Sequence, residues 1–405
     1  MFPRCIGVCL IVVVFILPMA AIRAAIFVGD KGKIIEQSGK LKPRWEYVSS
    51  RFYRHTPPPL ILAVQGGATH TMGVLFRYDT KIFRFKEVYR KQLEGSSLNH
   101  APERALSVVK QFISDNTEAY PSENMTVVMG MAGSGFAEGR GLFLSGLVES
   151  PKVVRAVLTS DAETAWLSVF DNEGLIIIAG TGGITLGVNR HGQTYMSGGF
   201  GGPVSDYPSA TSLVFDYDRC SDALSCFKEG QLEVLTPMPL LKQWIKQKGG
   251  SASHFFAYRS KLLTTGKNDE YASRAKDIIT FYKQHIAGQY DLKKAGSLSI
   301  NAKKSTTGGF SPEPKDYCVA YAMNKAVMCF KEELMARNSP EFKKVPFAFD
   351  GSVADELWQI LEKQQQTQGL KQRKSPLKPN LIVGALRLIY EDIPVAKFRR
   401  MMDAP

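Results

Sequence analysis

One local pattern occurs twice in this chain, and it limits the fold more than any other feature of the sequence. The first copy has an apolar run and two glycines in 60–67, followed by a second apolar run at 72–76. The second copy has an apolar run and the turn Gly-Thr-Gly-Gly in 175–183, followed by apolar residues at 186–188. We therefore expect strand, glycine turn, strand in each copy, produced by duplication of one unit.

Between and after the copies, apolar strands alternate with segments of helical spacing. Strands are expected at 82–89, 127–131, 153–158 and 345–349, and helices at 103–113, from near 162, at 355–362 and at 381–390. The stretch 211–338 is mostly helical in pattern, with a polar interruption at 293–312 that predicts a mobile insertion. This alternation predicts an α/β protein.

The 405 residues are enough for two domains and a sizeable core. We expect an N-terminal domain at 60–173 that is completed by 380–395, because the last apolar helix can cross back onto it. The C-terminal domain is expected at 174–379. Segment 26–59 is polar, basic and then proline-rich, which predicts a linker.

The first 25 residues resemble a targeting segment. Arg4 is followed by an apolar run at 5–22 and then by Arg23, a pattern typical of a signal peptide. A small-x-small cleavage site is not evident, so a retained signal anchor is the alternative. The sequence predicts the secretory pathway, either the endoplasmic reticulum or Golgi lumen or secretion, with membrane attachment only if this segment is retained. Asn124 begins a single glycosylation sequon.

Cysteine usage allows disulfides but predicts no metal site. Beyond Cys5 and Cys9 in the targeting segment, four cysteines remain: Cys220, Cys226, Cys318 and Cys329. Two short-range pairings, 220 with 226 or 318 with 329, and free thiols all stay open at this point. No CxxC pair and no histidine spacing predicts zinc.

The net charge of +13 does not by itself indicate a nucleic-acid-binding protein. Lysine and arginine are scattered along the chain. The basic stretch 242–248 contains only Trp244 as an aromatic, and 371–374 contains none, so bases would have little to stack on. We expect these stretches to be solvated surfaces.

The two glycine turns are candidate phosphate-binding sites, because backbone N–H groups at a glycine turn can approach a phosphate closely. The residues concerned are Gly66, Gly67 and Thr69 in the first turn and Gly180, Thr181 and Gly182 in the second. Two ordinary hairpins are the alternative interpretation. Two turns that face each other would grip a polyphosphate.

Asp161 is the candidate catalytic residue, because it follows a predicted strand at the point where a helix begins. A carboxylate there can accept the proton of an attacking hydroxyl. Helix capping is the alternative role, which Ser160 can fill instead. Asn99 and Asp206 lie in glycine-rich or serine-rich loops, where they are suited either to binding hydroxyls or to capping the loop.

These motifs together resemble the N-acetylglucosamine kinases and the wider BadF/BadG/BcrA/BcrD ATPase family of the actin, hexokinase and Hsp70 superfamily. The resemblance covers about 60–390. The matching segments, in the order of the family, are 65–69, 97–100, 159–162, 180–183, 198–201 with Asp206, and 351–353.

The resemblance implies a duplicated actin-like ATPase fold of the ribonuclease H-like type, with two domains around a nucleotide cleft. It implies an ATP-dependent sugar kinase that uses Mg²⁺ and phosphorylates N-acetylglucosamine or a related amino sugar at the 6-hydroxyl, with Asp161 as base. The implied sugar contacts are Asn99, Asp161, Gly199, Phe200, Gly201 and Asp206. The implied nucleotide contacts are Gly66, Gly67, Thr69, Gly180, Thr181, Gly182, Gly351 and Ser352. The implied partners are therefore small molecules, a sugar and ATP, and a homodimer stays open.

The chain also departs from this family at several positions. Gln65 stands where an acid normally supports the metal, and Ala68 replaces a glycine. Tyr207 and Pro208 follow Asp206 where Glu and Gly are usual, and Phe200 replaces a tryptophan. A non-catalytic relative that binds nucleotide or sugar is the alternative hypothesis. An ATPase coupled to electron transfer is disfavoured, because cluster-ligating cysteines are not evident.

Overall fold

The structure of the protein is a computed structural model. It describes residues 25–27, 32–38, 43–49, 60–67, 69–79, 81–82, 84–95, 97–99, 101–135, 137–200, 206–223, 225–228, 231–234, 238–248, 251–264, 268–287, 316–335 and 339–402. The expected targeting segment, apart from Ala25, and the expected insertion at 293–312 lie outside these residues. Within the described part of the chain, no helix combines the length and apolarity needed to cross a bilayer.

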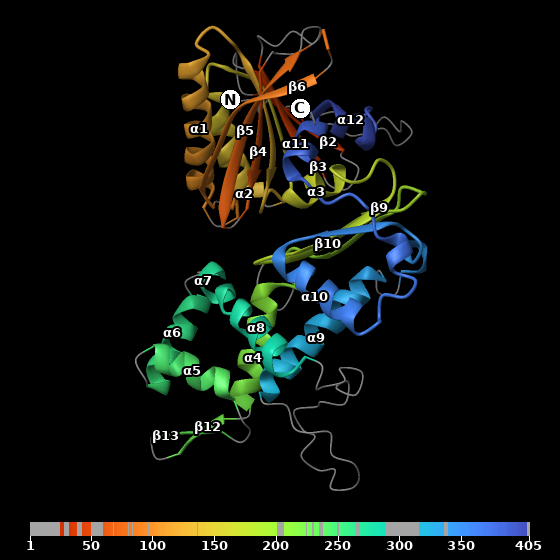
Figure 1. Cartoon of the computed structure of the whole chain (residues 1–405). Helices are drawn as coiled ribbons and strands as arrows, with labels where there is room; N and C mark the ends of the chain where they lie inside the picture. The colour runs from red at the N-terminus through yellow and green to blue at the C-terminus, as the bar shows by residue number, and fades with distance from the viewer. Residues whose placement is uncertain are drawn as a thin grey trace, which may run out of the picture.

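The first lobe is built on an eight-stranded mixed sheet with the order β1-β2-β3-β8-β7-β4-β5-β6 (Figure 1). The strands are β1 (Ala25–Phe27), β2 (Gly32–Ser38), β3 (Pro43–Ser49), β4 (Leu60–Gly66), β5 (His70–Asp79), β6 (Arg84–Glu94), β7 (Met125–Met131) and β8 (Val153–Thr159). Strands β4, β7 and β8 run parallel to one another, and the other neighbours are antiparallel.

Three of these strands correct the prediction of a linker at 26–59. β1, β2 and β3 form a meander, and β3 pairs antiparallel with β8 from Trp45 opposite Leu158 to Val48 opposite Arg155. In β3, the aromatic residues Trp45 and Tyr47 alternate with charged ones, which is the period-two signature of a strand. The prediction was wrong because the basic composition and the later prolines outweighed this short alternation.

Helices cover both faces of the first sheet, because its central strands are apolar on both faces. Leu60, Leu62 and Val64 pack with α1 and α2, whereas Ile61 and Ala63 pack with α3 and α11 on the other face. The helices are α1 (Pro102–Ala119), α2 (Ala137–Val148), α3 (Asp161–Leu167), α11 (Leu381–Arg387) and α12 (Val395–Met402). The apolar helix expected near the C-terminus is thus α11, and it packs on β4 and β7 of the first sheet.

The second lobe contains a four-stranded sheet with the order β11-β10-β9-β14. Its strands are β9 (Gly174–Ala179), β10 (Gly183–Val188), β11 (Thr194–Gly198) and β14 (Phe347–Asp350). As in β6-β5-β4-β7 of the first lobe, three antiparallel strands of a meander are followed by a parallel neighbour of the first strand. This correspondence agrees with the duplication predicted from the two glycine turns.

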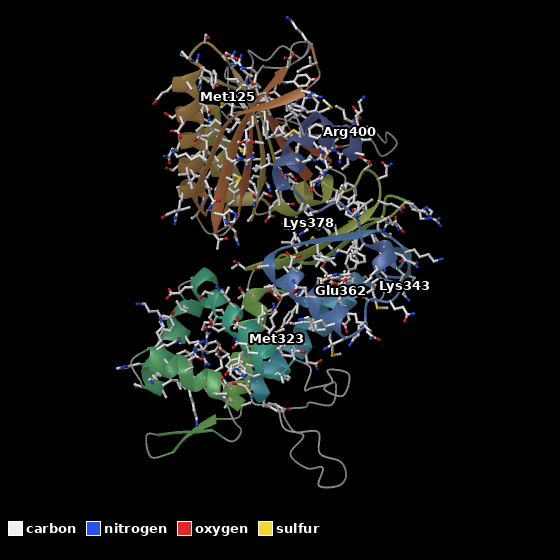
Figure 2. The ribbon with its side chains drawn as sticks, in the orientation of Figure 1. Met125, Met323, Lys343, Glu362, Lys378 and Arg400 are labelled. Carbon is white, nitrogen blue, oxygen red and sulfur yellow. A yellow bond between two sulfur atoms is a disulfide. The ribbon has the colours of Figure 1, made fainter. Side chains whose placement is uncertain are left out.

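Most of the remaining second lobe is helical: α4 (Ala210–Ala223), α5 (Pro239–Gln247), α6 (Ala252–Thr264), α7 (Asn268–Ser273), α8 (Ala275–His285), α9 (Tyr317–Leu334) and α10 (Ser352–Lys363). A small hairpin of β12 (Ser225–Lys228) and β13 (Gln231–Val234) and two 3-10 turns, Pro340–Phe342 and Lys371–Arg373, complete it. Each lobe has its own buried core. Met125 belongs to the core of the first lobe and Met323 to that of the second, and both are labelled in Figure 2.

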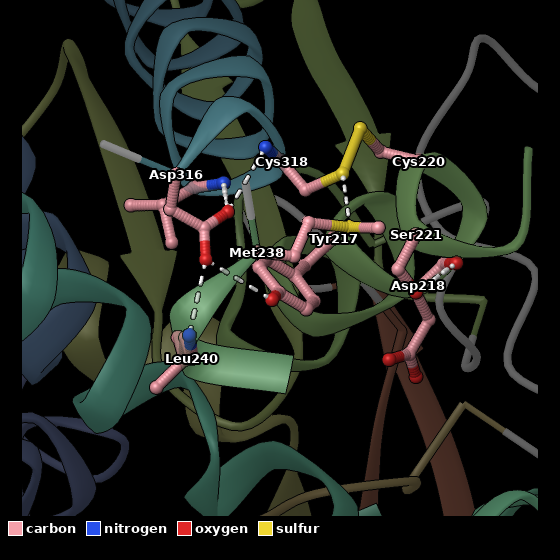
Figure 3. The surroundings of a disulfide bond; sticks show 9 residues. Tyr217, Asp218, Cys220, Ser221, Met238, Leu240, Asp316 and Cys318 are labelled. Atoms are coloured by element: carbon pink, nitrogen blue, oxygen red, sulfur yellow. Dashed lines mark hydrogen bonds between the residues drawn. A yellow bond between two sulfur atoms is a disulfide. The ribbon is translucent and has the colours of Figure 1, made fainter. Parts of the chain in front are cut away.

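A disulfide joins Cys220 of α4 to Cys318 of α9, 98 residues apart in the sequence (Figure 3). Both short-range pairings considered from the sequence, each of which used one of these two cysteines, are therefore wrong. Spacing alone could not indicate this bridge, because it depends on the packing of two helices that are distant in the sequence.

Helices α3 and α11 lie between the two sheets (Figure 1). The indole N–H of Trp166 in α3 donates to the carbonyl of Gly174 at the start of β9, at 2.9 Å. In α11, a Cβ at Gly384 would lie 1.7 Å from the carbonyl oxygen of Thr164, so the two helices touch backbone to backbone. This contact fixes α3, and with it Asp161 at its first position.

Candidate functional site

The predicted residues of the first lobe gather at one edge of its sheet. β4, β7 and β8 are parallel, so their carboxyl ends share that edge: Gly66 is opposite Met131, and Gly130 is opposite Thr159. Neighbouring strands lie about 4.8 Å apart. The first glycine turn, the loop after β7 and the start of α3 therefore form one row, where open α/β sheets place their ligands.

The first glycine turn is a tight hairpin. Gly67 donates its N–H to the carbonyl of His70 at 3.0 Å, and Gly95 donates to the carbonyl of Thr69 at 3.1 Å. The carbonyl of Gly66 accepts from Ala132 at 2.8 Å, which ties the turn to the loop after β7. Thr69 is exposed at the tip and Gln65 is half-buried in β4.

Asp161 is the first residue of α3, but Ser160 caps the helix. The Ser160 Oγ accepts the N–H of Glu163 at 3.1 Å, and the half-buried Asp161 carboxylate accepts the N–H of Ala162 at 2.9 Å. The first turn of a helix favours a negative charge, which suits a carboxylate at this position. Ser160 thus fills the capping role that the sequence allowed it.

Asn99 is held beside the loop after β7. Leu98 donates its N–H to the carbonyl of Ala132 at 2.9 Å, and Asn99 donates its own N–H to Ser97 Oγ at 3.3 Å. Gly133 has a φ of +78°, and a Cβ there would lie 2.6 Å from the Asn99 nitrogen. Gly133 is thus needed for this contact, a role that sequence reasoning missed although the glycine was visible.

The second glycine turn rests on the start of α4. Gly180 donates its N–H to the carbonyl of Gly182 at 3.0 Å, while the turn carbonyls of Gly180 and Thr181 accept from Ala210 at 2.8 Å and from Thr211 at 3.1 Å. The Thr211 hydroxyl adds a bond of 2.7 Å to the Thr181 carbonyl. Four bonds therefore fix the backbone of this turn.

Gly351 lies directly against the second turn. It follows β14, which is parallel to β9, and it has a φ of +99°. A Cβ there would lie 2.4 Å from the carbonyl oxygen of Ala179, so only glycine fits. Ser352 is exposed as the first residue of α10, whose cap Gly351 offers no side chain to the first-turn amides. Such a helix start favours anionic groups.

Asp206 lies beside the second glycine turn. It is buried, and a Cβ at Gly182 would lie 3.1 Å from its Oδ2. The residues after it depart from the family, yet α4 is still capped: Ser209 Oγ accepts the N–H of Ser212 at 3.0 Å, and Ser212 Oγ accepts the N–H of Ser209 at 2.9 Å. The departure therefore leaves the start of the helix intact.

Tyr207 occupies the position where the family usually has Glu, and the structure shows what holds it there. Its hydroxyl donates to Asp216 Oδ2 at 2.7 Å, and the Lys325 ammonium contacts both Asp216 Oδ1 at 2.7 Å and the Tyr207 oxygen at 3.0 Å. Burial, and then the charge of Asp216, raise the pKa of Tyr207, so it stays a neutral donor. Sequence reasoning missed Asp216 and Lys325, which are 109 residues apart.

The loop after β11 shows a mixed outcome for the predicted sugar contacts. Gly199, with a φ of +76°, donates its N–H to the carbonyl of Gly183 at 2.9 Å, which places it beside the second turn. Phe200 follows with 66% of its surface exposed, so its ring is not packed against the other site residues. Gly201 lies outside the described residues.

The site thus consists of two groups, each at the carboxyl edge of its own sheet. Gly66, Gly67, Thr69, Asn99 and Asp161 belong to the first lobe, and Gly180, Thr181, Gly182, Gly199, Asp206, Gly351 and Ser352 to the second. Within the part of the chain that the structure describes, no three acidic, histidine or cysteine side chains gather as a metal site. The groups combine a helix-start carboxylate with rigid glycine backbone, which suits anion binding and proton transfer.

Comparison with known proteins supports the fold. No protein-family model matches the chain. An N-acetyl-D-glucosamine kinase of Dictyostelium discoideum is 26% identical over 171 residues, which are 40% of this chain and 53% of that protein. The match therefore spans about half the length of that relative.

Two solved structures resemble the chain over most of its length. A proposed N-acetylglucosamine kinase of Chromobacterium violaceum has a TM-score of 0.58 at 17% identity, and one of Porphyromonas gingivalis has a TM-score of 0.54 at 16% identity. Each alignment covers 82% of this chain and 99% of the other. The chain therefore shares the two-lobed α/β fold of these two structures, the fold that the family resemblance implied.

Proposed function

We propose that the protein is an ATP-dependent sugar kinase that transfers the γ-phosphate of ATP to the 6-hydroxyl of N-acetylglucosamine or a related amino sugar. The observation that carries the proposal is the position of Asp161. It lies at the carboxyl end of β8, one strand away from the loop that holds Asn99, and Ser160 takes over the capping role. The similarity to N-acetylglucosamine kinases supports the choice of sugar.

Asp161 would act as the general base. Its carboxylate accepts the proton of the sugar hydroxyl as the hydroxyl oxygen attacks the γ-phosphorus and the bond to the β-phosphate oxygen breaks, which leaves ADP. Such proton transfer contributes roughly 10² to 10⁴ in rate. Asn99 and Asp206 would orient the sugar through its hydroxyl or acetamido groups.

The glycine backbone of both turns fits ATP. The absence of a side chain at Gly351 lets the start of α10 lie close to the second turn, so the first-turn amides of α10 would bind ATP phosphates together with that turn. Mg²⁺ would neutralise the charge that develops on the transferring phosphoryl group. Mg²⁺ commonly keeps several waters and few protein ligands, so the absence of a three-ligand cluster among the described residues is compatible with its use.

The test is direct measurement of sugar phosphate with the purified chain from Ile26 to Pro405, ATP, Mg²⁺ and a panel of hexosamines and hexoses. We expect turnover with an N-acetylated hexosamine, and a loss of about 10² to 10⁴ in kcat for Asp161→Asn. Asp277→Asn is the matched control, because Asp277 is also a carboxylate in the first turn of a helix, α8, and is not one of the proposed site residues. No product from the wild-type enzyme with any sugar would reject the kinase proposal.

A non-catalytic binding module is the second candidate, supported by three residues. Gln65 offers no charge to the metal, Ala68 replaces a glycine of the first turn, and Tyr207 is engaged by Asp216 and Lys325. Calorimetric titration with ATP and with N-acetylglucosamine separates the two functions. Binding without turnover would favour the module, and turnover that depends on Asp161 would exclude it.

We further propose that the protein works in an oxidising compartment of the secretory pathway, in the lumen or outside the cell, or anchored by its N-terminal segment. The disulfide between Cys220 and Cys318 supports this proposal, since such bonds persist in oxidising compartments. Asn124 of the sequon is exposed just before β7. Expression with a fluorescent tag, followed by fractionation and glycosidase treatment, tests the location; a cytosolic, unmodified protein would reject it.

The domain division expected from the sequence, 60–173 with 380–395 and 174–379, remains a proposal, with the sheet of the first domain extended by β1, β2 and β3. Limited proteolysis tests it, since cuts should fall near the proposed boundaries. Sedimentation analysis would decide between a monomer and a homodimer.

A further inference from the structure

Strand β3 contacts α3, which begins at Asp161, and α2, which follows the loop after β7. Adjacent residues of a strand point to opposite faces of a sheet. In β3, Arg44 lies on the face that α3 covers, and Trp45 lies on the face that α2 covers. A single strand therefore reaches the segment that starts at Asp161 and the segment that holds Asn99.

On the first face, Arg44 and Glu163 form a buried ion pair. The guanidinium donates through Nε at 2.8 Å and through Nη2 at 2.5 Å to Glu163 Oε1, while Oε2 accepts the Thr159 hydroxyl at 2.6 Å. The Glu163 side chain is fully buried and that of Arg44 is 10% exposed. Nη1 of Arg44 also pairs with Glu391, which precedes α12. Three nitrogens of the guanidinium thus link β3 to α3 and to the segment before α12, in a fixed planar geometry that a lysine ammonium does not have.

The ion pair acts on the start of α3. Glu163 is two residues from Asp161 in the same helical turn, and its backbone N–H is the donor to the Ser160 cap. A fully buried carboxylate that loses its partner must move toward water or bind a proton. Either change would displace the turn that carries Asp161.

On the other face, Trp45 supports the loop that holds Asn99. The guanidinium of Arg140 in α2 lies 3.5 Å from the centre of the Trp45 ring and donates to the carbonyl of Ser134 at 3.2 Å. Next to Arg140, a Cβ at Gly139 would lie 1.9 Å from the carbonyl oxygen of Leu98. The start of α2 therefore packs directly on the residue before Asn99.

We propose that β3 holds the first turn of α3, which carries Asp161, and the segment 97–99, which carries Asn99, in fixed positions, and that Arg44 is a positioning residue for Asp161. This proposal rests on the proposed kinase function, and it assigns an indirect catalytic role to a segment that its composition had marked as a linker. Arg44 does not touch the substrate; it acts through Glu163, the Ser160 cap and the first turn of α3. Trp45 acts in the same way on Asn99 through Arg140.

The test compares Arg44→Lys with Arg274→Lys in the full-length chain. Arg274 is a matched control because its Nη2 pairs with buried Asp218 at 2.7 Å, in the second lobe and away from the proposed site residues. Three quantities are measured for each: the melting temperature, kcat and KM for sugar and ATP, and hydrogen exchange of the backbone amides of 159–165.

For Arg44→Lys we expect kcat to fall by about tenfold to 100-fold, since small misplacements of a catalytic group have effects of this size. The KM for ATP should stay unchanged, and the amides of 159–165 should exchange faster. Arg274→Lys should lower the melting temperature without either effect. Glu391→Gln leaves the pair with Glu163 in place and should give a smaller change in the same direction, which covers the case in which Arg44→Lys does not fold.

Unchanged exchange at 159–165 in both Arg44→Lys and Glu391→Gln would overturn the proposal, as would a loss of kcat no larger than in Arg274→Lys. The exchange measurement needs no turnover. If the wild-type chain forms no sugar phosphate, the kinase proposal fails, and the role of Arg44 in fixing the first turn of α3 is still decided.

Discussion

The two glycine turns share a sequence pattern, but the structure supports them differently. The carbonyls of the second turn accept three hydrogen bonds from the first residues of α4, and Gly351 and Asp206 lie close to the turn. The first turn closes with one bond between Gly67 and His70, and backbone bonds to Gly95 and Ala132 hold its flanks.

The difference shows how a duplicated unit can divide its tasks. A turn whose carbonyls are bonded to the start of a helix is pre-organised for a ligand, and pre-organisation reduces the entropy lost on binding. Thr69, at the tip of the first turn, is exposed, and no helix start bonds to this turn in the way that α4 bonds to the second among the described residues. We therefore expect the second lobe to determine most of the affinity for the nucleotide, and the first lobe to supply the base.

The largest expected effect concerns the disulfide, because residues 25–200 contain no cysteine and only the second lobe is cross-linked. The pair Cys220→Ser with Cys318→Ser should lower the free energy of unfolding by about 4–5 kcal/mol, the loop-closure value for a loop of this length. Urea denaturation of wild type and variant measures this loss. Cys329→Ser, on the same helix but outside this disulfide, is the control, and an equal loss there would contradict the assignment.

Next in size is Gly351→Ala, set against Gly67→Ala. The first change forces a Cβ into a positive φ and to 2.4 Å from the Ala179 carbonyl, whereas a Cβ at Gly67 meets only the His70 oxygen at 3.4 Å. We expect Gly351→Ala to destabilise the chain by about 4 kcal/mol and to weaken ATP binding. Thermal unfolding and calorimetric titration measure both. Equal tolerance at the two positions would remove the difference between the turns.

A third prediction uses opposite pH responses in the two lobes. Burial raises the pKa of Asp316, in the second lobe, to about 6, although the N–H groups of Val319, Leu240 and Cys318 oppose this shift (Figure 3). The folded state thus binds the proton more tightly than the unfolded chain. The corresponding stability is present below about pH 4 and is lost as the pH rises through 6, by about 3 kcal/mol.

Asp316→Asn should remove that loss, as measured by urea denaturation at pH 4 and pH 7. Asp115 in the first lobe is the contrasting case, because hydrogen bonds from Lys91 and then Tyr89 lower its pKa. Asp115 stabilises the fold above the pKa of the unfolded chain, and this contribution is lost as the pH falls. Asp115→Asn should therefore reduce the loss of stability at low pH. Relative to wild type, the free energy of unfolding at pH 7 minus that at pH 4 should rise in Asp316→Asn and fall in Asp115→Asn. A change in the same direction in both variants would refute the prediction.

The smallest expected effect is that of Gln65→Glu, which gives the first turn the charge that it lacks. A carboxylate can bind the waters of Mg²⁺, so the Mg²⁺ concentration for half-maximal activity should fall several-fold. The measurement is a Mg²⁺ titration of sugar phosphate formation. Gln92→Glu, on the exposed surface of β6, is the control, and an equal shift there would mean that only net charge matters.

The sequence predicted most of the elements that carry the site. The apolar runs at 60–64 and 175–179 became the central strands β4 and β9, and the residue after β8, Ser160, caps α3 as expected. The prediction failed where local composition misled it, at β1, β2 and β3. It could not predict the contact of Lys325 with Tyr207 or the disulfide between Cys220 and Cys318, because each joins segments about 100 residues apart.

By itself, the sequence determined the duplicated strand-turn-strand units and the carboxylate at the start of α3. It also determined which turn positions are glycine, the residue that permits another backbone segment to approach closely. These features follow from local periodicity and from the conformational freedom of single residues. Only the tertiary structure decided how each glycine turn is bonded and which distant residue pairs with Glu163, two residues after Asp161. The contacts of Arg44 with Glu163 and of α4 with the second turn depend on the packing of segments far apart in the chain, which no local pattern encodes.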